Sequence, residues 1–149
     1  MLKAGLEQEG LQSLHVEDAY RRNPPTVSEN MRFGQVMRKM IEGTVRDFPV
    51  TDDQGHLVGV LSFDTLREFV YESNVNDLIL AKELMDDDPK TLTLADNLGH
   101  ALNLFAETDQ EELPVVDANK SEILLGMVSR RQVLDAYRRE LRRRTASEV

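Results

Sequence analysis

Two segments of the chain end in a serine that is followed by polar residues suited to different ligands. Ser129 precedes Arg130 and Arg131, whose guanidinium groups could bind a phosphate through paired hydrogen bonds. Ser62 precedes Asp64, whose carboxylate would repel the same group. A helix is predicted to begin after each serine, and the free N–H groups of a helix N-terminus favour an anion. We therefore expect an anion to bind beside Ser129, although both serines could equally serve only as helix caps.

The remaining candidate residues show no catalytic or metal-binding arrangement. The three histidines, His15, His56 and His100, lack the spacing of metal ligands. The acidic run at residues 86–88 could hold a divalent cation, but a solvated loop before a proline is the more usual reading. The sequence has no cysteine, nucleophile elbow, Gly-rich phosphate loop or dinucleotide fingerprint. The sequence predicts neither an enzyme nor a metal site.

Composition and charge restrict the class of protein further. The chain has 149 residues, of which 40% are apolar and 30% charged, as in globular proteins. Its formal net charge of −9 argues against nucleic-acid binding over the whole surface. No apolar run approaches the roughly 20 residues that cross a bilayer, and the first residues lack the order of a signal peptide. We expect this chain itself to be neither membrane-spanning nor secreted.

The chain contains an internal repeat. Pro49-Val50 and Pro114-Val115 are each followed by an acidic turn and then by Gly-x-x-Ser. Matching positions lie 65 residues apart before the turn and 67 apart after it, because the second turn is two residues longer. The match continues upstream, where Gly34 pairs with Gly99 at the same offset of 65. Agreement over several elements indicates two copies of one structural unit.

Each copy reads as strand, helix, strand, strand, helix. Short extended pieces are expected at residues 26–27 and 91–94, and apolar spacings of three and four predict helices over 33–41 and 98–105. Strands are expected at 47–51, 57–61, 112–116 and 124–128, with closing helices at 64–72 and 130–143. Ser28 and Asp96 are candidate N-caps, and a further helix is expected before each copy, at 10–20 and 76–85.

A single copy would expose the apolar faces of its sheet and helices, so two copies should pack together around one shared core. The predicted fold class is α+β, a sandwich-like arrangement of two βαββα units with pseudo-twofold symmetry. The predicted divisions are a linker helix at residues 1–13, a first repeat at 14–75, a second repeat at 76–144 and a tail at 145–149.

This arrangement resembles a tandem pair of cystathionine-β-synthase (CBS) domains, also called a Bateman module. The resemblance rests on the two Pro-Val-x-Asp segments and the two Gly-x-x-Ser ends, and it covers about Val16 to Glu140. It implies a non-catalytic regulatory module that forms a homodimer and is attached to an enzyme, transporter or channel. It also implies clefts between the repeats that bind an adenine nucleotide (ATP, ADP or AMP), with no cofactor required.

In the family the second strand ends in Gly-x-x-Thr/Ser-x-x-Asp, where the glycine admits the ligand and the Asp binds ribose hydroxyls. Here Thr65 and Gln132 occupy the two Asp positions, so both repeats lack the ribose-binding carboxylate in its usual place. If one cleft binds a nucleotide, the resemblance and the charges favour the cleft of the second repeat. The expected site residues are Thr26, Thr91, Ser129, Arg131 and Gln132.

Three stretches, at residues 14–18, 77–84 and 129–141, are similar to the cytoplasmic tails of bacterial ClC-family chloride channels. That similarity implies a chloride channel or transporter whose transmembrane domain precedes a linker at residues 2–12. The arginines of residues 138–144 could contact anionic lipid at the inner face of the membrane, or could simply complement the helix dipole. The alternatives are a structural dimerisation module without a ligand and a regulatory segment of a soluble enzyme.

Overall fold

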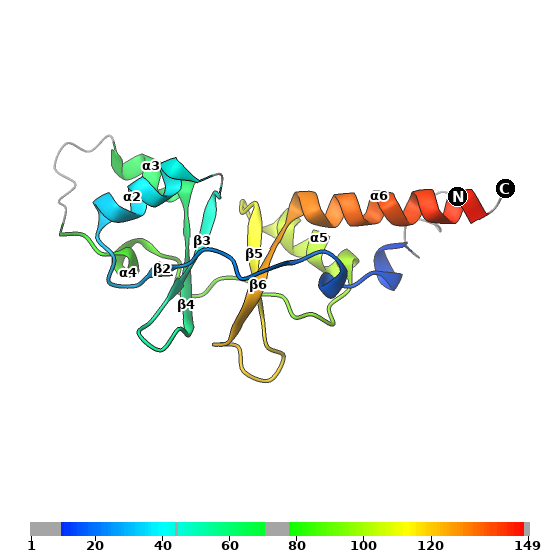
Figure 1. The fold of residues 1–149 in the computed structure, drawn as a ribbon, viewed down its shortest axis with the longest axis horizontal. Coiled ribbons are helices and arrows are strands. Elements are labelled where there is room, and N and C mark those ends of the chain that lie inside the picture. Colours follow the sequence, from blue (N-terminus) through cyan, green and yellow to red (C-terminus); the bar gives the residue numbers. More distant parts are fainter. Residues whose placement is uncertain (1–9, 44, 71–77, 148–149) are drawn as a thin grey trace.

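The computed structural model describes residues 10–43, 45–70 and 78–147 of the chain. Two three-stranded sheets lie side by side, each with its own helices (Figure 1). The first sheet has the order β2-β3-β4, and the second has the order β1-β6-β5. The strands are β1 (Arg21–Arg22), β2 (Val27–Ser28), β3 (Asp47–Thr51), β4 (Leu57–Ser62), β5 (Glu112–Val116) and β6 (Leu124–Ser129). The helices are η1 (Val16–Asp18), α2 (Phe33–Glu42), α3 (Phe63–Val70), α4 (Ala81–Leu84), α5 (Leu98–Glu107) and α6 (Arg130–Ser147).

The central hairpin of each repeat confirms the sequence prediction. β3 pairs antiparallel with β4, and β5 pairs antiparallel with β6. The first turn suits its sequence, because the Asp52 carboxylate accepts hydrogen bonds from the backbone N–H groups of Gln54 and His56 (both 2.9 Å). Gly55 closes the turn with a φ of +81°, which favours glycine. Together with the helices, these hairpins establish the α+β class.

The helix caps differ from the predicted ones. α5 is capped by Asn97, whose side chain accepts the N–H of His100 (2.8 Å), while Asp96 accepts the N–H of Thr93 one turn earlier. Ser28 is not a cap, because it lies in β2 and α2 begins at Phe33. In both cases a short polar side chain closes a local turn ahead of the helix instead of capping it.

The segment that begins each repeat packs on the opposite repeat. These exchanged segments are residues 14–22 and residues 79–86. Residues 21–22 form β1 beside β6 of the second repeat, while Asp86 bridges to Val60 of the first. The backbone N–H of Val16 donates to Asp96 (2.8 Å), and that of Ala81 donates to Met31 (2.8 Å). These two hydrogen bonds match each other at the offset of 65 residues, since Val16 corresponds to Ala81 and Met31 corresponds to Asp96. The exchange of segments therefore obeys the pseudo-twofold symmetry. The two repeats therefore each supply part of the other's structure.

The prediction of one shared core is wrong, because two apolar clusters form, one in each repeat, and each includes residues from the exchanged segment. In the second repeat Val16 and Ala19 are buried together with Phe105 and Val128. In the first repeat Ala81 is buried with residues of α2, β3, β4 and α3. The exchange explains why one repeat alone would be incomplete, since its core lacks residues that come from elsewhere in the sequence.

The helix predicted over residues 10–20 is interrupted. Residues 10–13 are helical, but His15 is extended and bridges to Asn97, and η1 forms only one short turn. α4 is likewise limited to four residues within the predicted range 76–85, of which residues 76–77 lie outside the described part of the chain. Docking onto the opposite repeat explains both interruptions, because the backbone there bonds to another segment and not to its own helix.

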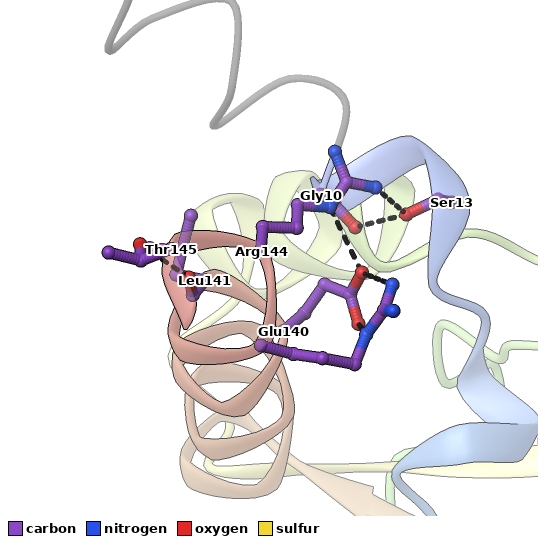
Figure 2. Close-up of polar contacts among 7 residues, drawn as sticks. Gly10, Ser13, Glu140, Leu141, Arg144 and Thr145 are labelled. Atoms are coloured by element: carbon purple, nitrogen blue, oxygen red, sulfur yellow. Dashed lines mark hydrogen bonds and ion pairs between the residues drawn. The ribbon is translucent and has the colours of Figure 1, made fainter. Parts of the chain in front are cut away.

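The start of the described chain is tied to the far end of α6. Arg144 lies between Glu140 and Ser13, donating to the Glu140 carboxylate (3.0 Å) and to the Ser13 hydroxyl (2.9 Å) (Figure 2). Of the predicted linker helix, residues 1–9 lie outside the described residues and 10–13 are helical. The predicted tail also differs, because α6 continues through residue 147 and Thr145 bonds back to the carbonyl of Leu141 (2.8 Å).

Candidate functional site

Two clefts lie at the junctions between a strand and the helix that follows it, one between β4 and α3 and one between β6 and α6. The first cleft has a volume of about 350 Å³ and surrounds the Ser62 end of β4. Its walls are Arg46, Asp47, Val60, Ser62, Phe63, Asp64, Thr65, Glu68, Asp86, Asp109, Gln110 and Glu111. Six of these residues carry carboxylates, whereas one guanidinium is present among the described residues that line it. Arg46 is therefore the one group among the described residues lining this cleft that an anion could bind.

The second cleft has a volume of about 470 Å³ and lies at the N-terminus of α6. Its walls are Arg46, Asp64, Glu111, Glu112, Ser129 and Arg131. Two guanidinium groups face three carboxylates here, and the first N–H groups of an 18-residue helix add to the positive side. Both volumes are within the range of small-molecule sites, and the second cleft has the larger share of guanidinium groups relative to carboxylates.

Ser129 caps α6 by a reciprocal pair of hydrogen bonds. Its hydroxyl oxygen accepts the backbone N–H of Gln132 (3.0 Å), and its own N–H donates to the Gln132 side-chain oxygen (2.9 Å). The capping reading of the sequence is therefore correct for this serine. It does not exclude ligand contact, because the hydroxyl accepts with its oxygen and keeps a hydrogen that it can donate.

Ser62 is engaged in the corresponding way at the start of α3. Its hydroxyl accepts the backbone N–H of Thr65 (3.2 Å) and lies 2.9 Å from the Thr65 hydroxyl. Thr65 and Gln132, the two residues at the positions expected to hold Asp, thus both fold back onto their serines. The side-chain oxygen of Gln132 is committed to this cap, although its amide nitrogen remains a donor.

The structure explains why glycine occupies positions 59 and 126, and the explanation differs from the one that the sequence suggested. A Cβ on Gly126 would collide with the Arg21 carbonyl and the Tyr20 ring, and one on Gly59 would come within 2.6 Å of the Asp86 carbonyl. These are the exchanged segments that form the edge of each sheet. The close approach permitted by each glycine is therefore to the protein's own backbone, and not to a ligand as the family pattern led us to expect.

The two arginines that begin α6 have different surroundings. Arg130 turns inward, where its guanidinium donates to the carbonyl of Phe105 (2.8 Å) and lies 5.8 Å from that ring's centre. Arg131 is exposed and lines the second cleft. A third arginine, Arg46, enters the cleft from the first repeat, just before β3. The sequence offered no signal for Arg46, because nothing local connects it to residues more than 80 positions away.

The other predicted site residues are not gathered in the same place. Ser129 and Arg131 line the second cleft together, whereas Gln132 lines a smaller neighbouring hollow with Tyr20 and Arg139. Thr26 and Thr91 are partly buried and are not among the residues that line either cleft. A ligand that uses all five would have to extend well beyond the second cleft.

Two carboxylates, buried Asp47 and partly buried Glu112, line the first and second cleft respectively. Burial raises the pKa of Asp47, opposed by hydrogen bonds that its carboxylate accepts from the backbone N–H groups of Glu112 (3.0 Å) and Glu111 (3.2 Å). Burial also raises the pKa of Glu112, against the attraction of Arg21 at 3.6 Å. Asp47 and Glu112 occupy matching positions in the two repeats, yet only Asp47 binds the backbone of the other repeat.

Comparison with known proteins establishes the family. The CBS domain family model matches residues 16–72 and 81–139, once for each repeat, which is well over half of the chain. The chain therefore belongs to the CBS domain family, and as a tandem pair it is a regulatory CBS-pair module. The two matches lie on the two halves found by the internal repeat.

The solved structures most informative for this chain are those of the CBS-pair protein CBSX2. CBSX2 from Arabidopsis thaliana is 27% identical, with a TM-score of 0.74 over 87% of this chain and 97% of that one. A structure of CBSX2 in complex with AMP is 28% identical, with a TM-score of 0.73 over 83% of this chain and 95% of that one. Binding of AMP is thus documented for a CBS pair of the same overall fold.

A homoserine O-acetyltransferase from Methanocorpusculum labreanum is 30% identical over 120 residues. The matched region is 80% of this chain but 23% of that protein, so the chain corresponds to a minor part of it.

Within the described residues, no helix is long and apolar enough to span a membrane. No group of three or more histidine, aspartate or glutamate side chains in that part of the chain could hold a metal ion.

Proposed function

We propose that this CBS pair is a sensor of an adenine nucleotide, which binds in the second cleft. The observation that carries the proposal is the position of Arg131 and Ser129 at the N-terminus of α6, in a cleft of about 470 Å³. The AMP complex of CBSX2 supports the ligand class. The phosphate would meet a guanidinium and a hydroxyl at the positive end of the α6 dipole, which are groups that stabilise phosphate in other proteins.

The same helix connects the cleft to the segment by which the chain enters the module. α6 begins at the cleft and spans about 27 Å, given 1.5 Å per residue over its 18 residues. Near its far end Arg144 binds Ser13 (Figure 2). The ring of Tyr137 lies beside Gly10, where an added Cβ would come within 3.1 Å of it. A shift of α6 on ligand binding would therefore move residues 10–13, and through them whatever domain precedes the module.

Calorimetric titration with ATP, ADP and AMP tests the sensor. Arg131→Ala should weaken binding by about tenfold, the value of one charge-assisted hydrogen bond. Arg142→Ala is the matched control, because Arg142 is an exposed arginine of α6 far from the cleft. Binding that is equal in both variants would refute the second cleft as the site. No binding of any nucleotide would leave a structural dimerisation module without a ligand.

We further propose that the attached domain is a ClC-type chloride channel or transporter, with this module on its cytoplasmic side. The support is the similarity of residues 14–18, 77–84 and 129–141 to such tails. The acetyltransferase relative favours the second candidate, a regulatory segment of a soluble enzyme. The coding sequence upstream of residue 1 distinguishes them: about ten apolar spans would identify a channel, and an acyltransferase domain would identify an enzyme.

Homodimer formation has support on the first repeat. Ile41 on α2 is 71% exposed and Val70 at the end of α3 is 48% exposed, so both large apolar side chains could pack against another molecule. We propose that a second copy covers this face. Ile41→Asp should convert the dimer to a monomer in light-scattering measurements, whereas Arg38→Asp on the same helix should leave it unchanged. A monomeric wild-type protein would contradict the proposal.

We also propose that C-terminal arginines contact lipid headgroups, but fewer of them than the sequence suggested, because several are paired with carboxylates. Arg143 and Arg144 are paired with Glu140, and Arg138 lies 3.7 Å from Asp135. Exposed Arg139 and Arg142 remain for the membrane surface. Flotation with vesicles containing phosphatidylserine should show binding that is lost in the double variant Arg139→Glu, Arg142→Glu; equal flotation of both proteins would contradict the contact.

A further inference from the structure

Arg46 stands at the boundary between the two clefts. It lines the first cleft and the second cleft, together with Asp64 and Glu111, so these three residues form a wall that both clefts share. Its position is fixed by the backbone, since its carbonyl accepts the N–H of Phe63 (2.7 Å). Its guanidinium lies 5.6 Å from the centre of the Phe63 ring, within the range of a cation–π contact.

The guanidinium of Arg46 is available to a ligand. The residue is exposed, and no carboxylate of the described residues forms an ion pair with it. Arg130, in contrast, is held by the Phe105 carbonyl. The second cleft therefore has one arginine from each repeat, Arg131 from the second and Arg46 from the first, on walls that belong to different halves of the molecule.

We propose that Arg46 completes the anion site of the second cleft, and that its sharing limits the module to one polyphosphate per chain. The inference rests on the proposed function and extends it to a residue of the other repeat. Two guanidinium groups that line one cleft suit a di- or triphosphate, which has more than one phosphate group to pair with them. A bound phosphate chain would then link the two repeats directly.

The limit of one ligand follows from the charges of the first cleft. Arg46 is the one cation among the described residues that line it, against six carboxylates. When Arg46 binds a phosphate in the second cleft, the first cleft is left with carboxylates alone, and a second anion would be repelled. Occupation of one cleft therefore excludes an anion from the other, although the two are built from matching positions.

Calorimetric titration of the full chain with ATP and, separately, with sodium tripolyphosphate tests the inference. The wild type should bind one equivalent of each per chain. Arg46→Ala should weaken both by about tenfold, and Arg46→Lys should recover part of the loss, since lysine keeps the charge but not the paired donors. Arg38→Ala, an exposed arginine of α2 outside both clefts, should bind as the wild type does.

The two ligands separate this inference from the sensor itself. Tripolyphosphate binding that depends on Arg46, without ATP binding, would support the anion site and refute the nucleotide sensor. ATP binding that depends on Arg131 but is equal in Arg46→Ala and Arg38→Ala would refute the role of Arg46 and leave the sensor standing. Two equivalents of ATP per chain would overturn the limit, and no binding of either ligand would overturn both proposals.

Discussion

The two clefts occupy matching places in the two repeats and differ chiefly in charge. Asp64 and Arg131 stand at the same position of their helices, two residues after the capping serine. The backbone, the cap and the glycine are shared, but one helix start carries a carboxylate and the other a guanidinium. The duplication thus gives two clefts with the same backbone, and charged side chains on their walls make the two clefts differ.

The difference between the repeats also extends to how each is held. Asp47 binds the backbone of the second repeat, whereas Glu112 at the matching position pairs with Arg21. In the second repeat α6 also binds the N-terminal segment, because Arg144 donates to Ser13. The second repeat is therefore tied to the start of the described chain.

The largest effect is expected at the glycines that admit the exchanged segments. Gly126→Ala should destabilise the fold by about 1–3 kcal/mol or more, because the new Cβ would overlap the Arg21 carbonyl. Gly59→Ala should be milder, since some of the atoms it meets belong to the flexible Met85 side chain. Urea denaturation measures both, and a neutral Gly126→Ala would show that the edge strand can shift without loss.

Asp47 should contribute about 1–3 kcal/mol to the junction of the repeats. Asp47→Ala leaves the N–H groups of Glu111 and Glu112 without their acceptor, which carries a desolvation penalty of that order. Asp47→Asn retains an acceptor and should be milder at neutral pH. Equal free energies of unfolding for Asp47→Ala and wild type would show that this contact does not hold the repeats together.

The raised pKa of Asp47 makes a separate prediction about pH. Because burial raises it above the ordinary value of 3.8, the folded state holds this proton more tightly than the unfolded state does. Its favourable contribution is complete below 3.8 and is lost as the pH rises through the raised value. Asp47→Asn should therefore flatten the pH dependence of unfolding above 3.8, leaving the part due to Glu112; an unchanged slope would contradict this.

A smaller effect on binding should come from the carboxylate on the shared wall. Asp64→Asn should strengthen tripolyphosphate binding several-fold at low salt, because one repulsive charge leaves the second cleft. Glu68→Gln is the control, since Glu68 lines the first cleft alone. Equal tightening by both variants would mean that overall charge, and not the wall of the second cleft, controls affinity.

The smallest effect should come from the clasp of α6. Hydrogen bonds from Arg143 and Arg144 lower the pKa of Glu140 from 4.5 to about 2, so its stabilisation is present above 4.5 and is lost as the pH falls toward 2. Glu140→Gln should lower the melting temperature slightly at pH 7 and speed hydrogen exchange at residues 10–14. Asp135→Asn, which breaks an exposed pair with Arg138, should not affect that exchange; equal exchange in both variants would contradict the clasp.

Local and repeated features of the chain were predictable from sequence. The offset of 65 residues revealed the duplication, and the apolar spacing located α2, α5 and both hairpins, because these depend on neighbours in the chain. The same features led to the α+β class and to the CBS resemblance. Ser129 and Arg131 were found because they are adjacent to a recognisable helix start.

Tertiary structure alone decided where the exchanged segments dock and which charges meet. Residues 14–22 and 79–86 show weak local patterns, and their structure is imposed by hydrogen bonds to the opposite repeat. Arg46 joins Arg131 only because the two repeats pack side by side, while Arg130, equally basic in sequence, is drawn away by Phe105. The sequence determined the helices and hairpins of each repeat, because these depend on residues that are neighbours in the chain. The packing of the two repeats decided which charged side chains line the same cleft, because those residues are far apart in the chain.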